Sequence, residues 1–201
     1  MSRQVCTTVY QFHELSDKAK ETARDWYRSR HYSDFDSVIE DAIRMGEIMG
    51  IDFDTSAIPL MNGGTRREPC VWWSVDYCQS DGAGFDGTYS YATNAHGKIR
   101  EEAPEDADLH AMADTLSELQ RKNHFKITAT IKDRNYHPTV EINPYDLHAD
   151  DDKALQDVFR DFNRWIYKQL CVEDEYQRAD LQVDEAIEAN EYEFTERGDG
   201  A

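Results

Sequence analysis

Apolar residues recur every three or four positions in several stretches of the chain, which is the spacing of a helix that buries one side. Four long stretches and one short one show this spacing: 17–30, 34–49, 104–123, 151–176 and 181–190. Ser16 precedes the first stretch as a suitable N-cap, and Gly50 follows the second as a C-terminal stop. We therefore predict five helices, each with an apolar stripe.

Shorter stretches that are rich in β-branched and aromatic residues, some with strict alternation, predict strands. They are 5–12, 51–54, 70–78, 88–93, 125–132 and 139–143. Residues 80–87 contain three glycines between two of these strands, so we expect a β-hairpin there with glycines at positive φ. Residues 62–69 combine Gly, Pro and charge without periodicity, and they are expected to form an exposed loop with a local basic spot.

These elements predict an α+β fold. We expect a single domain over residues 1–201, built on one antiparallel sheet of about four to five strands with helices packed on one face. A hydrophobic fraction of 39% and an aromatic fraction of 11% supply enough apolar material for a folded core. The acidic C-terminus is expected to fray from about residue 195.

Negative charge dominates the composition. The chain has 41 acids and 22 bases, a formal net charge of −19, and 26 of those acids lie in residues 101–201. A field of this sign repels nucleic acids and bilayer surfaces and attracts basic surfaces over long distances. We therefore expect no direct contact with nucleic acid or a membrane, and a basic protein surface as the partner.

Residue types that commonly hold metals or cofactors do not form a typical motif. The four cysteines lack a CxxC pair, which favours free thiols in a reducing cytoplasm, and the seven histidines are dispersed. Residues 82–87 match GxGxxG, but a strand is predicted after them where a dinucleotide site needs a helix, and Asp81 and Asp86 would repel phosphate. We expect no catalytic residues, no metal and no cofactor, and a protein that is not an enzyme.

Several segments resemble a family of tailed-bacteriophage proteins that is often labelled an antitoxin of a toxin–antitoxin stability system. The segments that carry the resemblance are 9–28, 79–87, 119–123, 159–167 and 184–194. The chain departs from the family pattern between about residues 55 and 75. The resemblance implies a phage-encoded protein that acts in the cytoplasm of a host bacterium.

Acidity and the phage resemblance together suggest an anti-defence protein of the anti-CRISPR or antirestriction type. Carboxylates fixed on helices can reach a charge density comparable to that of duplex DNA, which carries about one charge per 1.7 Å of axis. Such a surface would occupy the DNA channel of a host defence complex. The candidate partner-binding acids are Asp150, Asp151, Asp152, Asp157, Asp161, Glu173, Asp174, Glu175, Asp184, Glu185 and Glu188.

Two other interpretations stay open. The protein could be an antitoxin or adaptor that binds one basic partner through a shaped interface, with Trp72 or Trp73 as its anchor, since interfaces are enriched in Trp. Strand alternation would turn one of these two side chains inward and the other outward. Alternatively, the acids form a solvated surface that serves solubility alone.

Overall fold

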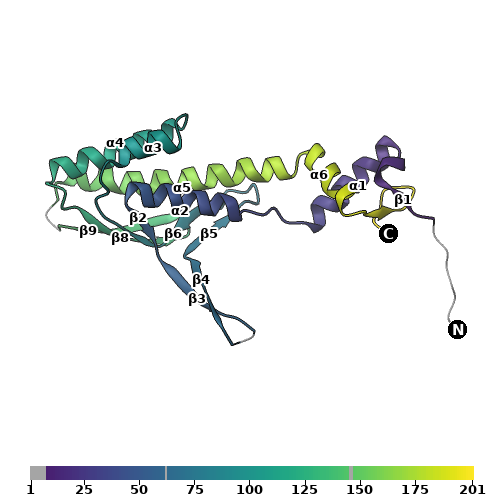
Figure 1. The fold of residues 1–201 in the computed structure, drawn as a ribbon, viewed down its shortest axis with the longest axis horizontal. Helices are drawn as coiled ribbons and strands as arrows, with labels where there is room; N and C mark the ends of the chain where they lie inside the picture. The colour runs from purple at the N-terminus through teal and green to yellow at the C-terminus, as the bar shows by residue number, and fades with distance from the viewer. Residues whose placement is uncertain (1–7, 62, 145–146) are drawn as a thin grey trace. The chain divides into compact units, whose positions relative to one another are not determined.

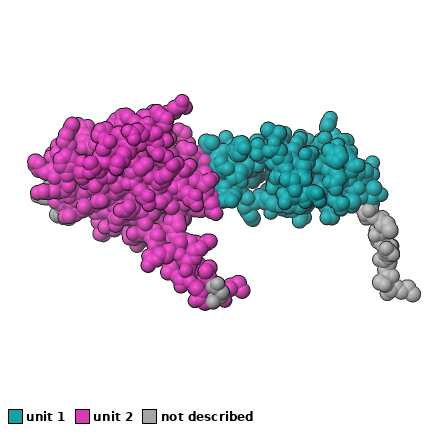
Figure 2. All heavy atoms as spheres, in the orientation of Figure 1, with its two compact units in different colours: residues 1–35, 172–201 teal, residues 36–171 magenta. Residues whose placement is uncertain are grey.

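The computed structural model describes residues 8–61, 63–144 and 147–201. The contacts between residues fall mainly within two compact units, which Figure 2 shows in different colours. Unit 1 comprises residues 1–35 and 172–201, and unit 2 comprises residues 36–171. Whether the whole chain folds as one cooperative domain, as the sequence suggests, stays a prediction.

Unit 2 contains an antiparallel sheet and the helices that cover it (Figure 1). Its helices are α2 (Asp36–Met49), α3 (Ala95–Glu102), α4 (Ala107–Lys122) and most of α5 (Ala149–Gln177). The part of α5 up to Cys171 belongs to this unit. Its four-stranded sheet has the order β2 (Ile51–Phe53), β7 (Gly87–Tyr89), β8 (Thr128–Arg134) and β9 (His137–Asn143). Two further antiparallel pairs are β3 (Thr55–Pro59) with β4 (Thr65–Pro69), and β5 (Val71–Ser74) with β6 (Gly82–Phe85).

The core of unit 2 lies between one face of the sheet and its helices. Alternate residues of β8 are buried, as expected of a strand with one covered face. Phe159 of α5 packs edge-on against Tyr89, and Phe162 packs in the same way against Phe85. The predicted α+β class, with antiparallel strands and helices on one face, is confirmed.

The glycine-rich residues 80–87 differ from the expected turn. Gly82 and Gly84 lie in the buried strand β6, which pairs with β5, and neither has a positive φ. Glycine is needed because neighbouring atoms come close: a Cβ on Gly84 would lie 2.5 Å from Cγ of Asp133, and one on Gly82 would lie 2.7 Å from Cγ of Tyr136. The prediction of a hairpin turn with positive φ was therefore wrong, since the glycines permit close strand packing.

Two further local predictions were wrong. Residues 65–69 form a strand of the β3–β4 hairpin, where a loop was expected. Both strands of this hairpin are largely exposed, so no alternation of apolar and polar residues marks them. Helix α3 was also missed, because it has only eight residues and buries only two of them, Ala95 and Ile99.

Unit 1 is a small helical unit closed by a short strand pair. Its elements are β1 (Tyr10–Gln11), the 3-10 helix η1 (Phe12–Glu14), α1 (Asp17–Arg30), the end of α5, α6 (Asp180–Ala189) and β10 (Glu193–Phe194). The side chain of Ser16 accepts a hydrogen bond from the Ala19 N–H, as predicted for the N-cap of α1. The strand predicted over 5–12 is confirmed only at Tyr10–Gln11, and its first residues lie outside the described part.

The C-terminal residues are held in place, in contrast to the fraying that we expected. β10 pairs with β1, and the N–H of Ala201 donates to the carbonyl of Glu193 at 3.0 Å. Phe194 is fully buried and packs against the rings of Phe12 and Trp26. The end of the chain is therefore part of the core of unit 1.

Replacing Phe194 with Ala should destabilise unit 1 by about 3–5 kcal/mol, because the change removes a fully buried ring and leaves a cavity. Denaturant unfolding can be followed through tryptophan fluorescence, to which Trp26 contributes, with its ring 5.5 Å from that of Phe194. Leu181→Ala is the control, because Leu181 is 66% exposed in the same unit. Equal effects of the two changes would show that the C-terminus is not part of the core.

Candidate partner-binding surface and pocket

The acids at the start of α5 do not all face solvent. Asp151 is only 6% exposed and accepts hydrogen bonds from Lys122 Nζ at 2.7 Å and Asn123 Nδ2 at 3.1 Å. These two donors hold the pKa of Asp151 below its usual value. Asp152 accepts a hydrogen bond from Gln156 one turn later. Asp151 therefore joins α5 to α4 and is not available to a partner.

Further along α5, two candidate acids have a partner within the same helix. Asp157 pairs with Arg160, and Asp161 pairs with Arg164 at 2.6 Å. Helix pairs at this spacing contribute only about 0.2–0.5 kcal/mol, so they reduce the local negative charge without fixing the side chains in place. Asp150, whose side chain is 90% exposed, is the most open acid of this region.

In unit 1, Asp174 and Asp184 are structural. Asp174 is 5% exposed and accepts a hydrogen bond from Ser33 Oγ at 2.6 Å. Asp184 binds Arg24 through two hydrogen bonds, of 2.6 and 2.7 Å, which tie α6 to α1. This pairing raises the pKa of Arg24 further above its ordinary value, mainly through the hydrogen bond to Asp184. Neither acid can leave its partner without cost to the fold.

Three of the four remaining candidates in unit 1 are exposed to solvent. Glu173 is half-buried and accepts a hydrogen bond from Gln177, whereas Glu175, Glu185 and Glu188 are exposed. The next acids along the chain, Glu191 and Glu193, are exposed as well, although they were not among the predicted site residues. No base among the described residues forms an ion pair with any member of this set, here called the open glutamates: Glu175, Glu185, Glu188, Glu191 and Glu193.

The two adjacent tryptophans differ in exposure. Both lie on β5, where Trp72 is opposite Gly84 and Trp73 is opposite Ala83. Trp73 is 37% exposed, whereas Trp72 is half-buried. Trp73 is thus the more accessible of the two possible anchors.

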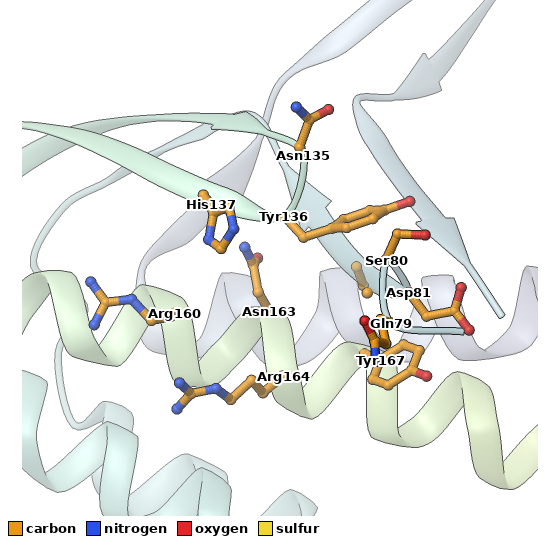
Figure 3. Close-up of a pocket in the computed structure, with 12 residues that line it drawn as sticks. Gln79, Ser80, Asp81, Asn135, Tyr136, His137, Arg160, Asn163, Arg164 and Tyr167 are labelled. Atoms are coloured by element: carbon orange, nitrogen blue, oxygen red, sulfur yellow. The ribbon is translucent and has the colours of Figure 1, made fainter. Parts of the chain in front are cut away.

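Unit 2 also contains a pocket that the sequence analysis did not predict. A cavity of about 660 Å³ lies between the loop before β6, the β8–β9 turn and α5 (Figure 3). Its polar lining includes His137, Tyr136 and Tyr167, together with Arg160 and Arg164. In Figure 3 the two guanidinium groups extend away from Tyr136, which agrees with their pairing to acids of α5. The pocket therefore does not present a cluster of free positive charge.

A buried polar pair lies next to this pocket. Asn163 Nδ2 donates to Asp133 Oδ2 at 2.7 Å, while Asp133 Oδ1 and Asn163 Oδ1 are buried and have no hydrogen-bond partner. Burial raises the pKa of Asp133 above its usual value, although the hydrogen bond from Asn163 opposes the rise. Because neither free oxygen reaches solvent, the pair is not placed to act as a general base on a ligand.

Asp81, which lines the pocket, is occupied by its own loop. Its carboxylate accepts hydrogen bonds from Ser74 Oγ, the Asp76 N–H and both the N–H and Sγ of Cys78. Burial acts to raise the pKa of Asp81, but these hydrogen bonds outweigh it and lower the pKa to about 2. In the described part of the chain, no three His, Cys, Asp or Glu side chains are grouped so that they could hold a metal ion.

Comparison with known proteins places all of unit 2 and part of unit 1 in one family. Residues 35–180 match the family model described as "Domain of unknown function (DUF8835)", and the chain belongs to this family. No curated protein and no solved structure matches the chain. None of the described helices has the length and apolar character needed to cross a bilayer.

The buried pair gives a pH-dependent prediction. Because the pKa of Asp133 is raised on folding, the stabilisation linked to its proton is complete below the ordinary value of 3.8 and is lost as pH rises through the raised value. Asp133→Asn keeps the shape but brings N–H donors and no charge. The variant should therefore be more stable than the wild type by about 1–3 kcal/mol at neutral pH, with the difference shrinking in acid.

Denaturant unfolding at a series of pH values measures this difference. Asp150→Asn is the control, because the Asp150 side chain is 90% exposed and its replacement should change stability little at any pH. An Asp133→Asn variant that is less stable than the wild type at neutral pH would contradict the account of the buried pair.

Proposed function

We propose that this protein is a non-enzymatic, phage-encoded inhibitor that binds a host nucleic-acid-handling defence complex, such as a CRISPR effector or a restriction nuclease. In this proposal it acts in the host cytoplasm and occupies a basic DNA-binding surface by acidic mimicry of DNA. The observation that carries the proposal is the set of open glutamates in unit 1, which are exposed and lack ion pairs among the described residues. The phage-family resemblance supports the choice of partner.

Only some of the predicted partner-binding acids are available for contact with a partner. Asp151, Asp174 and Asp184 serve the fold, and Asp157 and Asp161 are partly neutralised within α5. Glu185 and Glu188 are three residues apart on α6 and so lie on the same side of that helix. Together with a net charge of −19, these exposed carboxylates favour attraction to a basic channel.

The antitoxin or adaptor interpretation remains the alternative, and the exposure of Trp73 favours it. A single exposed aromatic residue can dominate an interface when it fills a pocket on the partner. Under this alternative, Trp73→Ala would weaken binding more than the reversal of the open glutamates would. The comparison of these two variants separates the two interpretations.

Reversing the charge of Glu175, Glu185 and Glu188 together to Lys should weaken inhibition. The assay is displacement of labelled duplex DNA from a purified CRISPR effector or restriction nuclease of the host. We expect the concentration for half displacement to rise by at least about tenfold, since each lost carboxylate removes a favourable charge contact.

The matched control reverses Glu40, Glu47 and Glu101, three exposed acids of unit 2, and so changes the net charge by the same amount. This control should displace DNA nearly as well as the wild type. Equal loss in both triple variants would mean that net charge alone matters, and no loss in either would overturn the proposed surface.

A further inference from the structure

The β3–β4 hairpin is an exposed two-stranded ribbon that extends from the rest of unit 2 (Figure 1). All five residues of β3 are exposed, as are the first three of β4. Among the described residues, β3 pairs only with β4, so its other edge has no strand beside it. An isolated hairpin of this kind is marginally stable in water, and an open strand edge is a template for pairing with another chain.

The hydrogen-bonding pattern shows which backbone groups lie on the open edge. The Leu60 N–H donates to the carbonyl of Gly64, and the Cys70 N–H donates to that of Asp54. In an antiparallel ladder the hydrogen-bonded positions alternate, so the backbone N–H and C=O groups of Ser56 and Ile58 also point toward β4. Their neighbours on the strand face outward, which leaves the N–H and C=O groups of Thr55 and Ala57 and the C=O of Pro59 on the open edge.

The two edges of the ribbon differ in charge. The sequence of β3 is Thr-Ser-Ala-Ile-Pro, without a charged residue, whereas β4 carries Arg66, Arg67 and Glu68. Charged side chains protect an edge strand from pairing with other strands, so β4 is protected and β3 is not. Symmetric pairing through β4 would place Arg67 opposite Arg67 of the other chain, which is unfavourable.

We propose that β3 pairs with β3 of a second copy of this chain, antiparallel about a two-fold axis at Ala57. In this register the two Ala57 residues exchange both of their hydrogen bonds. The Thr55 N–H of each copy donates to the Pro59 carbonyl of the other. Because Pro59 has no N–H, the outward donors of β3 are the N–H groups of Thr55 and Ala57, and both are satisfied in this register. The two hairpins then form one four-stranded sheet.

Self-complementarity favours a second copy over the strand of another protein. The side chains that meet across the axis are Thr55 with Pro59, Ser56 with Ile58, and Ala57 with Ala57, and none of them carries a charge. Twofold pairing of identical surfaces is also the commonest route to a closed oligomer. The interaction does not depend on the proposed inhibitory function, because it uses no residue of the open glutamates.

Sedimentation equilibrium of the full chain over a wide concentration range tests the proposal. The wild type should form dimers, and added salt should strengthen them, because two chains of −19 each repel one another in low salt. Ala57→Lys should raise the dimer dissociation constant by at least about tenfold, because two like charges then meet directly across the axis.

Two further samples make the test specific for the register. Thr65→Lys adds the same charge to the exposed start of β4 and should leave the dimer unchanged. A mixture of Ala57→Lys and Ala57→Glu should restore dimers, since opposite charges then meet at the axis. A wild type that is monomeric throughout, equal effects of Ala57→Lys and Thr65→Lys, or a mixture that stays monomeric would each overturn the proposal.

Discussion

The excess of carboxylates over positive charges constrains the whole surface of this protein. With 41 acids and 22 bases, at least 19 acids cannot have a cation of their own. The carboxylates that connect helices form ion pairs with nearby bases, as Asp151 does with Lys122 and Asp184 with Arg24. The open glutamates of unit 1 are left without ion pairs among the described residues, and they give the protein its strongest candidate for a binding surface.

The sequence predicted elements where burial leaves a periodic pattern and failed where it does not. Helix α5 buries one continuous stripe, so its apolar spacing was visible, and Ser16 was identified as a cap from its residue type and position. The exposed hairpin β3–β4 has no buried face and therefore no pattern. Gly84 was misread because the feature that requires glycine, Asp133, lies 49 positions away in the sequence and close only in the fold.

The candidate site, like the fold, could be predicted from the sequence only in part. Charge along the chain identified the acidic C-terminal half, but not which acids are paired. Asp174 and Glu175 are adjacent in the sequence, yet one is buried against Ser33 and the other is exposed. Pairing of this kind depends on residues far away in the chain, which one sequence does not reveal. The pocket beside Asp133 was not predicted for the same reason.

The two proposed interactions respond to salt in opposite ways, because one joins unlike charges and the other joins two acidic copies. The central claim is that unlike charges hold the complex with the defence protein, and the salt dependence of its dissociation constant tests this claim most directly. Exposed charges are screened within about 10 Å at 0.1 M salt. We predict that affinity falls steeply as salt rises. An affinity that does not change with salt would contradict charge mimicry.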